Sequence, residues 1–135
     1  MTHKKVLERF KQTLDKMETI QEEGFNYSSY VNSCGTTRCI CGYYPLWFKR
    51  SWTLLNYEFP RLKYKSNDYT EDDLSKFHGI ALGAIRALFY ANHTNQRLLD
   101  LPMKDTHSSL EEVKSLFKVF YEKLQDDDFY NRVKI

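Results

Sequence analysis

Three cysteines lie within eight residues of one another, in the most unusual segment of the sequence. This segment runs from Cys34 to Gly42 and reads CGTTRCICG. An odd number of closely spaced cysteines is a poor framework for disulfides, and reduced thiols in a cytosol fit it better. A buried and unreactive thiol is therefore the default expectation for each of the three.

Zinc binding is the alternative for these thiols. Cys34 and Cys39 are separated by four residues, which is an acceptable spacing for a ligand pair, and Cys41 could join them. Further ligands would have to be histidines, which are scattered without a paired spacing at His3, His78, His93 and His107. We expect neither a metal nor any other cofactor, and keep zinc at the three cysteines as the alternative.

The same segment has the features of an anion site. Gly35 permits backbone angles that other residues avoid, and Thr36 or Thr37 can cap a helix that follows. A helix start directs unpaired N–H groups and the positive end of its dipole toward one point, and Arg38 adds a fork of donors. We therefore predict ligand contacts from Gly35, Thr36, Thr37 and Arg38. In the alternative interpretation these residues only form a tight turn.

Basic and aromatic side chains gather in the middle third of the chain, residues 25–67. This third has six basic residues and one acidic residue, whereas residues 68–128 have seven basic and twelve acidic residues. It also holds 11 of the 21 aromatic residues. The six basic residues are Arg38, Lys49, Arg50, Arg61, Lys63 and Lys65.

Cations among aromatic rings suit a ligand that carries both phosphates and bases, because charge attracts one part and ring faces stack on the other. The rings that we predict to stack on such a ligand are Tyr43, Tyr44 and Trp47. In an equally weighted alternative, the basic third and the acidic stretch after it dock on each other inside the fold.

The cysteine segment resembles a Cys-Gly-Thr-x-x-Cys-x-x-Gly pattern of small, largely uncharacterised proteins encoded by tailed bacteriophages. The matching residues are Cys34, Gly35, Thr36, Cys39 and Gly42, followed by Tyr43. A weaker match runs from Phe77 to Ile80, where His78 is inserted relative to the usual Phe-Gly-Leu, and leads to Ala87-Leu88-Phe89. The resemblance covers about half of the chain. It implies a phage origin, and no established activity or catalytic residue comes with it.

Patterns that would indicate an enzyme are weak. Cys34 or Cys39 near a helix start could act as a nucleophile of lowered pKa, but no histidine is marked as its base. The acidic clusters at 22–23, 72–73 and 126–128 fall at expected helix ends, where such residues usually stay solvated. The sequence has no phosphate-binding loop, dinucleotide fingerprint or His-Glu-x-x-His motif. We leave the question of an enzyme open and favour a binding protein.

These observations favour a phage accessory protein, located in the host cytoplasm, that binds an anionic small molecule. The favoured ligand is a nucleotide or a nucleotide-derived host immune signal, and sequestering such a signal would be a counter-defence role that the resemblance implies. The alternative is a protein-interaction module that inhibits a host enzyme through an exposed aromatic or acidic face around residues 121–135. A nucleic-acid-binding protein comes third. Exposed aromatic residues would also favour a homodimer.

The elements that must position these residues are predicted to be mainly α-helical. Apolar periodicity predicts a compact single domain, residues 1–135, of about five helices, over 3–23, 36–44, 70–79, 81–91 and 108–124. Thr70 is the expected cap of the third helix, and Ser108 with Glu111 has the spacing of a capping box for the last. Pro45 either kinks the second helix or opens another short turn.

The remaining segments are expected to be irregular. A short hairpin near residues 54–64 fits the pattern, with Pro60 arguing against a central strand. Residues 92–106 are expected to be a connection and the tail from about 126 to be frayed. The sequence has no apolar run long enough to span a membrane and no apolar core of a secretory signal, so we expect a soluble protein without a membrane partner.

Overall fold

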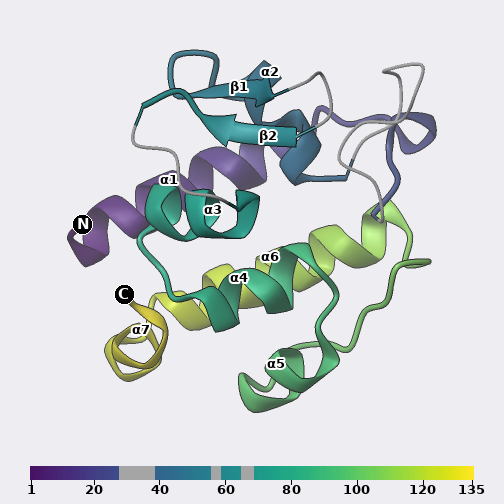
Figure 1. Cartoon of the computed structure of the whole chain (residues 1–135). Coiled ribbons are helices and arrows are strands. Elements are labelled where there is room, and N and C mark those ends of the chain that lie inside the picture. The colour runs from purple at the N-terminus through teal and green to yellow at the C-terminus, as the bar shows by residue number, and fades with distance from the viewer. Residues whose placement is uncertain (28–38, 56–58, 65–68) are drawn as a thin grey trace.

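The computed structural model describes residues 1–27, 39–55, 59–64 and 69–135 and is mainly helical (Figure 1). Within these residues there are seven α-helices and one two-stranded antiparallel hairpin. The elements are α1 (His3–Met17), α2 (Tyr44–Trp47), β1 (Trp52–Leu55), β2 (Phe59–Leu62), α3 (Thr70–His78), α4 (Leu82–Phe89), α5 (His93–Leu98), α6 (Leu110–Leu124) and α7 (Asp127–Val133), with 3-10 turns at Glu22–Gly24 and Cys41–Tyr43. The predicted helical class and hairpin are confirmed, but the predicted count of about five helices is wrong.

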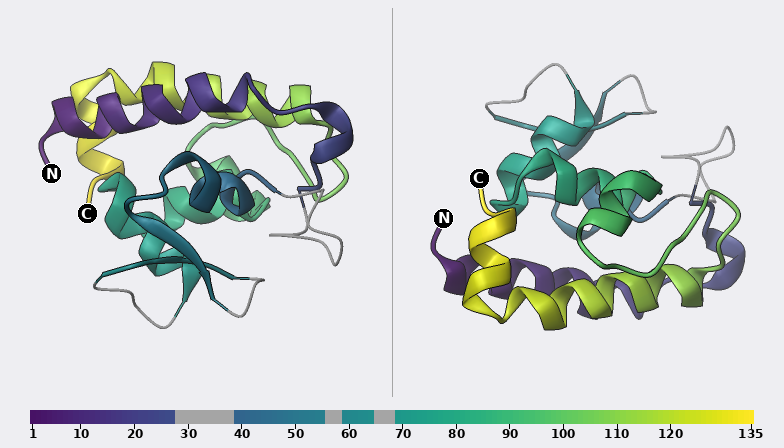
Figure 2. Two further views of the ribbon diagram at one scale, coloured as in Figure 1. Left: turned by 90° about the horizontal axis from the view of Figure 1, so that it is seen from above. Right: turned by 90° about the horizontal axis from the view of Figure 1, so that it is seen from below.

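The elements form three layers. Helices α1 and α6 lie side by side and antiparallel, α3 and α4 lie over them, and the hairpin lies on the far side of α3 (Figure 2). The two chain ends come close together, since the N–H of Ile135 donates to the carbonyl of Gly79, whose backbone lies against Met1. None of the helices in the described ranges combines the length and the apolar character needed to cross a membrane.

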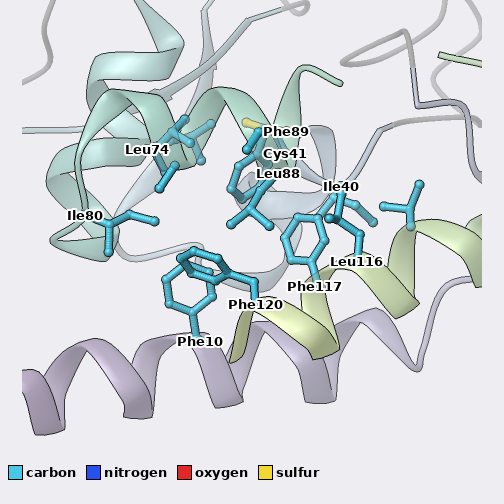
Figure 3. Packing of buried hydrophobic residues seen from close by; sticks show 14 of the residues in the cluster. Phe10, Ile40, Cys41, Leu74, Ile80, Leu88, Phe89, Leu116, Phe117 and Phe120 are labelled. Atoms are coloured by element: carbon cyan, nitrogen blue, oxygen red, sulfur yellow. The ribbon is translucent and has the colours of Figure 1, made fainter. Parts of the chain in front are cut away.

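The core lies between the α1–α6 pair and the α3–α4 layer. Large apolar side chains from all four helices are fully buried there, and Figure 3 shows Phe10 of α1 facing Phe120 of α6, with ring centroids 5.2 Å apart. Leu74 of α3 and Leu88 of α4 close the core from the other side. Each such buried side chain contributes about 1.5–3 kcal/mol relative to exposure, so this contact holds the layers together.

Helix α1 is shorter than the predicted 3–23 and ends at Met17. The N–H groups of Thr19 and Ile20 donate three residues back, to the carbonyls of Lys16 and Met17, which tightens the last turn. The Thr19 hydroxyl also donates to the Lys16 carbonyl at 2.6 Å. This side chain competes for a carbonyl that a continuing helix would use, so the helix stops there.

Two short helices occupy segments that we predicted to be irregular. Helix α5 lies inside the expected connection, capped by Asn92 and anchored by the fully buried Gln96. Helix α7 replaces the expected frayed tail, because Asp126 accepts the N–H of Phe129 at 2.9 Å and the rings of Phe129 and Tyr130 are buried. Caps and tertiary burial thus order segments that are too short to show a clear period.

Two predicted caps are wrong. The hydroxyl of Thr70 donates to the carbonyl of Pro60 at 3.0 Å instead of capping α3, so it joins α3 to the hairpin. The capping box of α6 is formed by Ser109 and Glu112, one residue later than predicted, because the Ser108 hydroxyl accepts the N–H of Asp105 in the preceding turn.

The end of α3, the start of α2 and the hairpin agree with prediction. Helix α3 ends as expected at Gly79, whose φ of 73° lies in the left-handed region that glycine tolerates. Pro45 takes the second of its two predicted roles and lies at the start of α2. In the hairpin, Trp52 pairs with Leu62 and Leu55 with Phe59.

Candidate functional site

The predicted anion-binding residues Gly35, Thr36, Thr37 and Arg38 lie outside the described residues, as does Cys34. The predicted stacking residues Tyr43, Tyr44 and Trp47 are all described, in the short segment that includes α2. The structure therefore bears on the aromatic half of the predicted site.

Tyr44 is not available for stacking, so its predicted role is wrong. Its side chain has no exposed surface, and its ring packs edge-on against Trp52 and Phe89. Its phenolic oxygen lies 2.6 Å from Nε2 of His78, and burial raises the pKa of the phenol well above its ordinary value. Tyr44 is a structural residue that ties α2 to α3.

Tyr43 and Trp47 are half-buried and lie at the surface. Their rings stack with centroids 5.2 Å apart and planes 16° apart, and the Tyr43 hydroxyl donates to the carbonyl of Gly24. Trp47 lines a hollow of about 480 Å³ together with Phe48 and Arg50. The ring pair is thus held in a fixed orientation beside an open space.

Two cations lie next to Trp47, and a third lies beside the loop that carries them. Lys49 and Arg50 line the same hollow, and the backbone N–H of Lys63 donates to the carbonyl of Ser51 at 2.8 Å, which places Lys63 beside this loop. All three side chains are exposed, and none forms an ion pair with a carboxylate in the described ranges. We call this set the basic aromatic surface: Tyr43, Trp47, Lys49, Arg50 and Lys63.

Arg61 behaves differently from these cations. Its Nε donates to Oδ2 of Asp73 at 2.9 Å, and that fully buried carboxylate also accepts the N–H of Leu62 at 3.0 Å. The docking of the basic third on the acidic stretch is therefore real at this position. Asp73 is not the solvated helix-end residue that we expected, because it holds β2 against α3.

A second hollow, of about 350 Å³, opens on the other end of the hairpin. Exposed Leu55, Phe59 and Tyr69 form much of its wall, with exposed fractions of 48%, 43% and 67%. We call it the aromatic groove, lined by Leu55, Phe59, Arg61, Tyr69, Thr70, Glu71 and Tyr90. The sequence analysis missed it, although a hairpin that pairs Leu55 with Phe59 is a signal that could have found it.

Cys39 and Cys41 are free thiols buried in the core. Burial raises the pKa of the Cys39 thiol to about 11, which is opposite to the lowered value that a nucleophile needs. Among the described residues no three metal-ligating side chains come together, so the zinc alternative gains no support from Cys39 and Cys41.

His78 is the other buried group that could do chemistry. Its ring is fully buried and stacks on Phe10 with centroids 4.3 Å apart, and its Nδ1 has no hydrogen-bond partner in the described part of the chain. Burial, with a smaller effect of the Arg9 charge, lowers its pKa to about 3. A neutral imidazole without access to solvent suits packing and not proton transfer to a ligand.

The face around residues 121–135 was predicted to be an exposed aromatic or acidic surface, and its aromatic form is wrong. Phe129 and Tyr130 are buried, and the Tyr130 ring stacks on His3 with centroids 4.0 Å apart. Asp127 is 89% exposed and pairs with His3 at 3.4 Å. The acidic residues at 126–128 are exposed, and so are Asn131, Arg132, Lys134 and Ile135, so the exposed part of this face is polar and of mixed charge.

The comparisons with known proteins give no family to which this site could be assigned. No protein-family model, no curated protein and no solved structure matches the chain.

Proposed function

We propose that the protein binds an anionic, nucleotide-like molecule at the basic aromatic surface. The observation that carries this proposal is a group of exposed cations without a paired carboxylate among the described residues. Lys49 and Arg50 line the hollow at Trp47, whose ring stacks on Tyr43. Lys63 is joined through its backbone N–H to Ser51, which lines the same hollow. Unpaired cations raise the local concentration of anions, and a fixed ring offers a stacking platform.

The chemistry divides between the two kinds of side chain. The planar guanidinium of Arg50 suits a phosphate because it offers paired donors, while Lys49 and Lys63 act as point charges. The Trp47 ring, which lines the hollow beside them, would take the base. The predicted helix over 36–44 is not found in its described part, since residues 39–40 are not helical and Cys41–Tyr43 is a 3-10 turn. Gly35, Thr36, Thr37 and Arg38 stay predicted ligand contacts, with the Arg38 guanidinium as a further donor for the phosphate.

The biological role in this proposal rests on the bacteriophage resemblance of the cysteine segment. A phage protein that holds a host immune nucleotide in the cytoplasm would remove the signal without changing it chemically. This role needs a binding surface and no catalytic group.

Calorimetric titration with ADP tests the proposal. Arg50→Glu should weaken ADP binding at least ~10-fold, since it removes a charge-assisted contact and adds repulsion. The matched control is Lys4→Glu, the same charge change at an exposed position in the first turn of α1, where a carboxylate is favoured. Equal affinities of the two variants, or no ADP binding by the unmodified protein, would contradict the proposal.

A further inference from the structure

One face of the hairpin connects the basic aromatic surface with the aromatic groove. The bond from the Lys63 N–H to the Ser51 carbonyl extends the ladder, in which Thr53 pairs with Arg61 and Leu55 with Phe59. Because side chains alternate along a strand, the residues of these three pairs share one face. Ser51 lines the hollow at Trp47, and Leu55, Phe59 and Arg61 line the groove.

The distance along this face is longer than one nucleotide. Lys63 directly follows β2 and is four residues from Phe59, which corresponds to roughly 13 Å at the usual rise of a strand. The bases of a stacked strand are only about 3.4 Å apart along its axis, so two bases stacked on each other would not reach from one hollow to the other. A ligand whose phosphate lies at Lys63 therefore places a base in the groove only if it has a further nucleotide whose base is splayed away from the first.

The groove itself suits an uncharged ring. Arg61 is paired with Asp73, and the Glu71 carboxylate accepts hydrogen bonds from Nε and Nη2 of Arg86 at 3.0 and 2.9 Å. Charges in and behind the wall thus neutralise one another. Apart from Thr70, the rest of the wall is apolar or aromatic. The volume of the groove lies at the lower end of the roughly 300–1,000 Å³ that is usual for small-ligand sites.

We infer that the aromatic groove takes a second base of the ligand, so that the ligand is a linear oligonucleotide of at least two nucleotides. This inference rests on the proposed function. The phosphate lies at Lys49, Arg50 and Lys63, one base stacks at Trp47, and the next base enters the groove against Phe59 and Tyr69.

Calorimetric titrations with AMP and with the linear dinucleotide pApA test this inference. The dinucleotide should bind about 10-fold more tightly than AMP, because a stacked base adds this much affinity. Phe59→Ala should remove this additional affinity for pApA. It should change the affinity for AMP by less than about two-fold, because the groove is far from the hollow at Trp47 and distant sites act nearly independently. The matched control is Leu98→Ala, which removes another exposed apolar side chain, on α5.

The possible results separate the two claims. If AMP binds and pApA binds no more tightly, the inference is wrong while the proposed function stands. If Phe59→Ala weakens AMP and pApA equally, the groove does not read a second base and the inference is again wrong. If neither ligand binds, the proposed function fails and the inference with it. Tyr69→Ser, an exposed change on the opposite wall, gives the same test should Phe59→Ala disturb the hairpin.

Discussion

The imidazole of His78 and the phenol of Tyr44 show how strongly depth in the fold changes what a residue can do. Both side chains are fully buried and lie 2.6 Å apart at Nε2 and the phenolic oxygen. The residue types alone made Tyr44 a candidate for ligand stacking and His78 an insertion in a weak motif. Residue type and spacing predict which interactions a side chain can make. Whether that side chain is exposed depends on tertiary contacts, which a single sequence does not show.

At this scale we predict that acid destabilises the protein through His78. Its pKa is about 3 in the folded protein, against about 6.5 in an unfolded chain. Between these values the unfolded state binds more protons, so the free energy of unfolding should fall by about 1 kcal/mol for each pH unit below 6.5 and stop falling near pH 3. Urea unfolding between pH 7 and pH 4 measures this slope.

The control for this slope is His78→Gln, which removes the titrating group from the same position. The variant is expected to start less stable, because Gln does not reproduce the stacking on Phe10. Its stability should nevertheless depend less steeply on pH than that of the unmodified protein. Identical slopes would show that other groups cause the acid response.

Among the elements, the long helices were predictable and the short ones were not. Helix α6 has apolar residues at helical spacing along 15 residues, and the sequence located it to within two residues. Helices α5 and α7 have six and seven residues, fewer than two full periods. Their order comes from caps and buried contacts, which periodicity does not report.

The shifted capping box gives a prediction at the scale of one helix. Ser109→Ala should lower the free energy of unfolding by about 1 kcal/mol, because the N–H of Glu112 loses the acceptor it has at 3.2 Å. Ser108→Ala is the matched control. It should lower the free energy of unfolding by only a few tenths of a kcal/mol, roughly, because the Ser108 hydroxyl accepts a hydrogen bond in an exposed turn. Urea unfolding of both variants measures the difference. A larger loss from Ser108→Ala would place the cap where the sequence suggested it.

Over the whole molecule, the described basic residues of the middle third fall into two groups, one paired with a carboxylate and the other exposed and unpaired among the described residues. Arg61 docks on the acidic stretch through Asp73, as the internal-docking alternative predicts. Lys49, Arg50 and Lys63 have no such partner in the described ranges, as the ligand-binding interpretation requires. Lys49 and Arg50 lie beside Trp47, and Lys63 is bonded to Ser51 of the same hollow. Composition predicted the imbalance, but only the tertiary contacts show which cation pairs with a buried carboxylate. The candidate site was therefore predictable as a region and not as a set of residues.

The most direct test of the central claim is to map ADP binding by two-dimensional ¹H–¹⁵N correlation spectra of the labelled protein. The account predicts shifts that saturate with ADP at the amides of Trp47, Lys49, Arg50 and Lys63, while those of α6 and α7 stay unchanged. A spectrum that ADP does not alter, or shifts confined to α6 and α7, would contradict the account.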